Sequence, residues 1–149
     1  MSKFRLGIVL RLREMAEDTA RINLGHALDT HQRALNGVQA AQARARDEMN
    51  YLSDLQQRPS DASELQAAVA AVATAQRGIV TAEERLNRAS KALFEARQAL
   101  AECTKQREVV ERLRDRFLAD ERREADRRET LAMAEIASTA HAVRAARNR

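Results

Sequence analysis

The strongest pattern in this chain is a seven-residue repeat of apolar positions between residues 65 and 117. One series consists of large residues: Leu65, Val72, Ile79, Leu86, Leu93 and Leu100. A second series, three residues further on, consists mainly of small ones: Ala68, Ala75, Ala82, Ala89, Ala96, Cys103, Val110 and Phe117. Apolar residues in steps of three and four mark the a and d positions of a coiled coil. The repeat predicts a long helix that packs this apolar stripe, its seam, against another helix.

An earlier apolar run predicts a first helix over about residues 4–57. No proline interrupts this segment, and its apolar positions also alternate in steps of three and four from residue 24 onward, which is helical periodicity. We place its seam on these positions: Leu24, Leu28, His31, Leu35, Val38, Gln42, Ala45, Met49 and Leu52.

The single proline, Pro59, marks the break between the two runs. Proline in a helix interior loses a hydrogen bond and clashes with the preceding turn, so we expect a turn over residues 58–60. Asp61 followed by Glu64 resembles a capping box, and the second helix is therefore predicted to span about residues 61–145. A turn this short makes the two helices antiparallel neighbours.

The two seams together predict a register. Each seam residue of the first helix meets a seam residue of the second when the two residue numbers sum to 117. This register sets Val38 against Ile79, and its midpoint falls at the predicted turn. Gly37 and Gly78 flank this pair, and we expect them to let the two backbones approach closely. The predicted fold is all-α: a long antiparallel two-helix coiled-coil hairpin that forms one domain over residues 1–149.

The predicted second helix is longer than the first, so residues 118–149 form a C-terminal overhang without a partner in the chain. Opposite charges three and four residues apart over residues 120–130 support helix formation. Ala132, Ile136, Ala140 and Val143 then make a short apolar stripe. We expect the overhang to be helical, and either frayed or ordered only on a partner.

Composition points to binding rather than catalysis. The 149 residues carry a net charge of +4, spread along the chain, and this favours a solvated helix exterior over a nucleic-acid-binding face. The lone Cys103 suits a reducing cytoplasm. No apolar run approaches the about 18 residues that a membrane span requires, and the arginines near the N-terminus argue against a signal peptide.

No catalytic or ligand-binding motif competes with the coiled-coil pattern. His26, His31 and His141 lack metal-binding spacing, and the chain has no glycine-rich phosphate loop. Two paired helices also offer no concave pocket in which a pKa could be shifted. We expect no catalytic residue, no metal and no cofactor.

The N-terminus carries a more specific signature. Phe4, Leu6, Val9 and Leu10 have the spacing F-x-L-x-x-V-L and are followed by Arg13. Together with Glu17, Ala20 and Tyr51, this opening resembles that of the flagellar FliJ family. The succession of helix, break and longer helix over the whole chain is also similar, whereas the motif itself covers residues 4–20.

The resemblance implies a non-enzymatic stalk protein of the flagellar type III protein export apparatus. The family fold is an antiparallel two-helix coiled coil similar to the central stalk of rotary ATPases. Family members contact the hexameric export ATPase and the cytoplasmic domain of the membrane export gate, and some are linked to escort chaperones. The implied protein is monomeric and cytoplasmic, associates peripherally with the inner face of the cell membrane, and promotes export.

On this interpretation the end of the hairpin that carries the N-terminus enters the ATPase ring. We expect ATPase-binding residues there: Phe4, Arg5, Leu6, Leu10, Arg11, Arg13, Arg122, Arg123, Arg127 and Arg128. Leu6 and Leu10 are expected to share an exposed stripe that helix packing leaves free. Tyr51 and Leu55, near the turn, are expected to be exposed contacts for the export gate.

Two alternatives share parts of this pattern. The stalk protein of a virulence type III secretion system has the same architecture but usually lacks the F-x-L-x-x-V-L opening. A generic structural coiled coil would dimerise in parallel, but the break at Pro59 and the register around it favour a hairpin within one chain.

Overall fold

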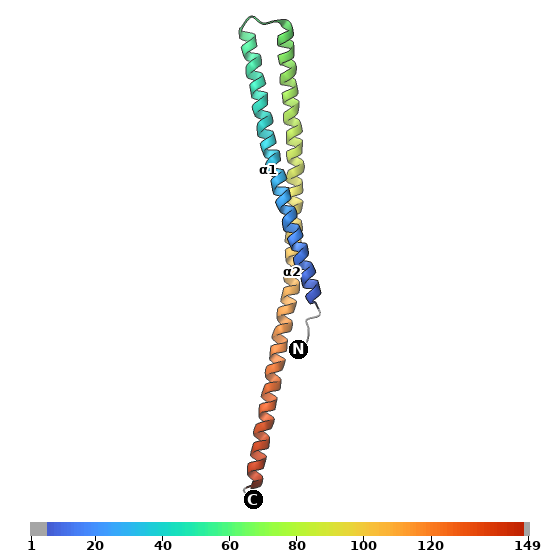
Figure 1. The fold of residues 1–149 in the computed structure, drawn as a ribbon, viewed down its shortest axis with the longest axis vertical. Coiled ribbons are helices and arrows are strands. Elements are labelled where there is room, and N and C mark those ends of the chain that lie inside the picture. Colours follow the sequence, from blue (N-terminus) through green and yellow to red (C-terminus); the bar gives the residue numbers. More distant parts are fainter. Residues whose placement is uncertain (1–5, 148–149) are drawn as a thin grey trace. The chain divides into compact units, whose positions relative to one another are not determined.

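A computed structural model describes residues 6–147 as two helices. Helix α1 spans Gly7–Gln57 and helix α2 spans Ala62–Arg147 (Figure 1). The predicted all-α, two-helix fold is confirmed, and the bounds lie within three residues of those predicted. Phe4 and Arg5 lie outside the described residues.

The chain packs as two units. The hairpin unit consists of Ala16–Cys103, and the terminal unit consists of Met1–Met15 with Thr104–Arg149. In the hairpin unit α1 and α2 run antiparallel on either side of the turn (Figure 1). That both units belong to one domain stays a prediction.

The α2 side of the hairpin core follows the heptad repeat. The small series supplies its most buried residues, which are Ala68, Ala75, Ala82 and Ala89. Leu93 is buried, whereas Leu65, Val72, Ile79 and Leu86 are half-buried. The small residues of α2 are therefore the most deeply buried, and the large residues that alternate with them are only partly covered.

The α1 side differs from the predicted seam at three positions. Leu28 and Met49 are 45 % and 42 % exposed, and Gln42 is also exposed, so these predicted seam positions are wrong. A second heptad series on α1, which we call the companion series, is buried or half-buried in their place. It consists mainly of alanine: Ala20, Ala27, Ala34, Ala41, Glu48 and Leu55. The remaining seam positions are buried or half-buried: Leu24, His31, Leu35, Val38, Ala45 and Leu52.

This companion series explains the close packing of the two helices. Ala34 lines the same groove as Ala82, and Ala41 lines the same groove as Ala75. Both pairs have numbers that sum to 116, next to the predicted register of 117. Small residues of both helices thus line the same hollows.

Gly37 and Gly78 do not serve the helix contact, so the expectation that they let the backbones approach is wrong. A Cβ atom added at either glycine would meet no atom within 4 Å. Both glycines line a groove on one side of the hairpin instead.

Side-chain hydrogen bonds close the turn between the helices. The Ser60 hydroxyl donates to the carbonyl oxygen of Leu55 at 2.6 Å, which caps the end of α1. Asp61 precedes α2, and its carboxylate accepts a hydrogen bond from the Ser63 hydroxyl at 2.6 Å. This bond, with further backbone hydrogen bonds from Ser63 and Ala62, lowers the pKa of Asp61 below its ordinary value of 3.8. Asp61 thus acts as the N-cap that the sequence predicts.

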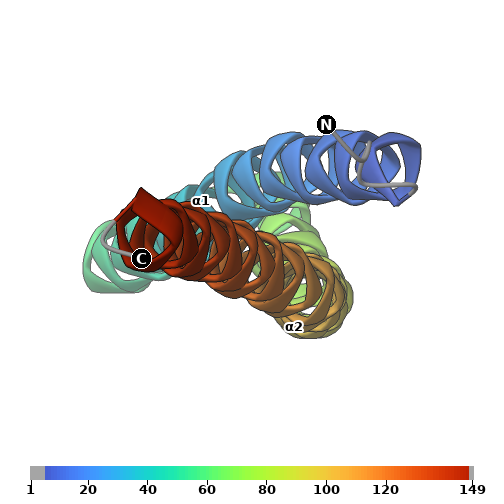
Figure 2. The same cartoon turned by 90° about the horizontal axis from the view of Figure 1, so that it is seen from below.

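The terminal unit pairs the start of α1 with the middle of α2. Leu10 and Val110 are buried, and Arg13 donates a hydrogen bond to the side chain of Gln106. From Leu118 to Arg147 every residue is exposed, and the helix continues without interruption (orange to red in Figures 1 and 2). These exposures agree with the predicted helical overhang.

Candidate interaction surfaces

The described residues present several exposed surfaces. Within residues 6–147 no group of three or more His, Cys, Asp or Glu side chains could hold a metal ion. Cys103 is a free, half-buried thiol on the α2 seam. Across the same residues, neither helix is apolar enough over a sufficient length to cross a membrane.

The start of α1 presents an apolar surface, but not through the predicted pair. Leu10 is only 6 % exposed, so the expectation that it shares a free stripe with Leu6 is wrong. Ile8, Leu12 and Met15 are instead 73 %, 58 % and 65 % exposed. Their spacing of four and three residues places them on one face of the helix.

The sequence reasoning missed this face although its signal is visible. Ile8, Leu12 and Met15 have helical spacing that would have revealed them. They overlap the F-x-L-x-x-V-L signature, whose own residues were the ones predicted to bind. We name Ile8, Leu12 and Met15 the N-terminal stripe.

Some arginines near the N-terminal stripe and on the overhang bond to neighbouring side chains, and others are simply exposed. Arg11 is exposed, whereas Arg13 donates to Gln106 on α2. On the overhang Arg123 lies 3.6 Å from the carboxylate of Asp120. Arg128 likewise lies 3.2 Å from the carboxylate of Glu124, while Arg122 and Arg127 are exposed.

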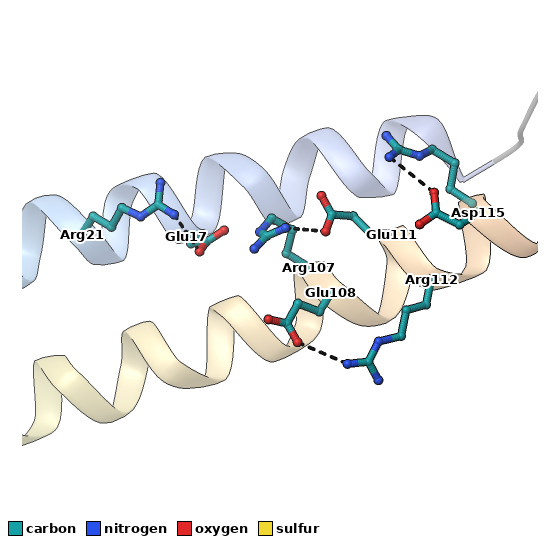
Figure 3. A network of polar contacts seen from close by, with 8 residues as sticks. Glu17, Arg21, Arg107, Glu108, Glu111, Arg112 and Asp115 are labelled. Atoms are coloured by element: carbon teal, nitrogen blue, oxygen red, sulfur yellow. Dashed lines mark hydrogen bonds and ion pairs between the residues drawn. The ribbon is translucent and has the colours of Figure 1, made fainter.

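Other charged side chains stabilise single helices, as Figure 3 shows. Arg107 pairs with Glu111 at 2.5 Å and Arg112 pairs with Glu108 at 3.5 Å, each within α2. Pairs four residues apart contribute about 0.2–0.5 kcal/mol to a helix. These pairs support the helix.

Glu17, the glutamate of the N-terminal signature, is buried. Only 4 % of it is exposed, and its carboxylate pairs with Arg21 on the same helix at 2.9 Å (Figure 3). A buried carboxylate needs such partners because its desolvation costs several kcal/mol. Glu17 is therefore placed for a structural role rather than for contact with a partner.

The surface near the turn also differs from the prediction. Leu55 is fully buried, so the expectation that it is an exposed contact is wrong. Tyr51 is exposed, as predicted. On α2 a shallow apolar hollow lies close to the turn, and exposed Val69 lines it with Leu65 and Ala73.

Comparison with known proteins matches the chain to a protein family. The family model described as flagellar FliJ protein matches residues 2–146. No curated protein and no solved structure matches the chain.

Proposed function

Because the chain belongs to the flagellar FliJ family and is thus associated with flagellar export, we propose that it is a connector between two export components. The start of α1 and the overhang of α2 bind the hexameric export ATPase. The surface near the turn binds the cytoplasmic domain of the export gate. The chain promotes export by these contacts and performs no chemistry of its own.

The observation that carries the proposal is the N-terminal stripe. Three large apolar side chains on one helix face are more than half exposed. Burying a side chain of this size gains about 1.5–3 kcal/mol relative to leaving it in water. The stripe is therefore a source of binding energy at the start of α1.

Exposed arginines add a second, weaker contribution to ATPase binding. Arg11 follows Ile8 by three residues, and Arg122 and Arg127 lie on the overhang. Exposed charges contribute little to affinity but accelerate association with an acidic surface, and salt screens them. We assign these arginines to steering rather than anchoring.

The gate contact rests on Tyr51 and Val69. Both are exposed, and they lie near the turn on α1 and α2. Val69 lines an apolar hollow, which can accept an apolar side chain of a partner. This pair replaces the predicted pair of Tyr51 and Leu55.

The test compares two double variants in binding to the cognate export ATPase, measured by fluorescence anisotropy. Ile8→Ala/Leu12→Ala should weaken binding about tenfold or more, which corresponds to about 1.4 kcal/mol. The control, Val80→Ala/Phe94→Ala, removes two exposed apolar side chains from the hairpin unit and should leave affinity unchanged. Circular dichroism checks that helicity is retained. Equal weakening by both variants would show that the stripe is not the anchor.

A second pair of measurements tests the orientation. Tyr51→Ala/Val69→Ala should lose binding to the gate domain and keep binding to the ATPase. Ile8→Ala/Leu12→Ala should do the reverse. If the variant near the turn alone abolished ATPase binding, the assignment of the two surfaces would be reversed.

A further inference from the structure

A groove lined by small residues follows one side of the hairpin unit. It consists of two adjoining hollows of about 800 Å³ and 620 Å³, which share Ala41 and Gly78. Both helices contribute to the larger hollow, chiefly with these residues: Ala34, Gly37, Ala41, Gly78, Ala82 and Ala89. The groove therefore belongs to the α1–α2 pair rather than to either helix alone.

The glycines of the groove are not explained by the packing of the two helices. A Cβ at Gly37 or Gly78 would meet no atom within 4 Å. Each glycine costs about 1 kcal/mol relative to alanine in a helix interior. The hairpin would tolerate side chains at both positions, so the open space is available to something outside it.

The rim of the groove is positive. Arg33, Arg85 and Arg88 line the larger hollow, and no carboxylate lines it. Arg33 is already paired with Asp29 on the same helix, so Arg85 and Arg88 carry the positive charge there. The smaller hollow is lined by Arg44 and by Glu48, its only acidic residue. Apart from the paired Arg33, three guanidinium groups (Arg44, Arg85 and Arg88) stand against one carboxylate, which favours an acidic occupant.

The dimensions fit a helix. The groove extends along about residues 30–48 of α1, or about 27 Å at 1.5 Å per residue, which is five helical turns. Small side chains permit close approach of a third helix, and an amphipathic helix buries its apolar face in such a groove.

We propose that this groove binds an acidic amphipathic helix of a partner protein, with Asp or Glu residues flanking its apolar face. A second copy of this chain fits less well. Its exposed helical segment, residues 118–147, carries six acidic residues and six arginines, so its charges cancel. The proposal is independent of the ATPase and gate contacts, because it involves neither the N-terminal stripe nor the surface near the turn.

The probe is a pair of labelled synthetic helical peptides, each of about 21 residues, or six turns. Both present the same alanine and leucine face, which is flanked by Glu in one peptide and by Lys in the other. Titrated with the full chain, the Glu peptide should bind at least about tenfold more tightly than the Lys peptide. Added salt should reduce the difference, because the arginines are at the surface. Arg85→Glu should reduce it as well.

A variant that fills the groove provides the structural test. Gly37→Leu/Gly78→Leu should weaken binding of the Glu peptide about tenfold or more. The matched control is Gly25→Leu, because Gly25 also has open space at its Cβ position but does not line the groove. It should bind as the unaltered chain does. Leucine favours helix more than glycine, so both variants should fold.

Three outcomes would overturn the proposal. The first is no binding of the Glu peptide at concentrations up to about 1 mM, where binding energies are about 4 kcal/mol. The second is equal binding of the two peptides, or equal binding by the filled variant and its control. The third is sedimentation that shows a dimer of the unaltered chain and a monomer of the filled variant, which would make a second copy the occupant.

Discussion

The phenol oxygen of Tyr51 on α1 donates a hydrogen bond to Oε1 of Glu64 on α2, at 3.2 Å. The guanidinium of Arg58, in the turn, lies 3.5 Å from the same oxygen. Glu64 was predicted to complete a capping box with Asp61, but it instead joins the first turn of α2 to α1 and to the turn. Residues 51 and 64 have numbers that sum to 115, close to the predicted register.

Replacing Tyr51 with Phe removes this hydrogen bond and keeps the ring. Tyr51 is exposed, so the change leaves no cavity. Loss of the hydrogen bond should lower the free energy of unfolding in urea by about 0.5–1.5 kcal/mol, the usual net value of one such bond. In a Glu64→Gln background the same change should cost less, because the charged acceptor is gone. A loss above about 2 kcal/mol would mean that the hydroxyl has a different role from the one that its geometry indicates.

Two leucines test which positions form the seam. Leu93 is buried and Leu28 is half exposed, although the sequence places both in the seam. Leu93→Ala should lower the free energy of unfolding by roughly 2–4 kcal/mol, through lost burial and a cavity. Leu28→Ala should cost less than half of that. If both variants lost the same stability in thermal melts, Leu28 would be a seam residue after all.

Two substitutions by leucine distinguish the helix contact from the groove. Ala45 is 2 % exposed, so Ala45→Leu should overpack the seam and destabilise the hairpin by about 1–3 kcal/mol. Gly78→Leu places its side chain in open space, and leucine has the higher helix propensity. It should leave the melting temperature unchanged or raise it. A lower melting temperature for Gly78→Leu would show that the groove is closed in solution.

The capping carboxylate predicts a dependence on pH. The Ser63 hydroxyl holds the pKa of Asp61 below 3.8, so the folded pKa is depressed relative to the unfolded one. Its contribution to stability is present above pH 3.8 and is lost as the pH falls through the folded pKa. Ser63→Ala removes the largest cause and should raise the pKa of Asp61 toward 3.8, as NMR titration would measure. Asp61→Asn, which still caps the helix, should lose this acid-dependent step, and a step that persisted would belong to another carboxyl group.

The candidate contacts were only partly predictable from sequence. The N-terminal signature pointed to the start of α1, where Ile8 and Leu12 are exposed, whereas Leu10 of the signature is buried. Near the turn, Tyr51 is exposed as predicted and Leu55 is not. Which of two neighbouring apolar residues faces solvent depends on how the helix is rotated about its axis, and spacing alone leaves that open.

The sequence by itself determined the helices, the turn and the α2 seam. Leu65, Leu93 and the alanines of α2 repeat with one strict period, and only one face of a helix contains them. Pro59 ends the first pattern, and Asp61 starts the second.

The tertiary structure alone decided which face of α1 is buried. Leu28 and Met49 lie beside Ala27 and Glu48, and residues one apart differ by roughly 100° around a helix, so both choices extend the same heptads. The larger apolar residues suggested one rotation of α1. The structure adopts the other, with Ala27, Ala34 and Ala41 half-buried, because small side chains let two helices approach more closely than leucine would allow.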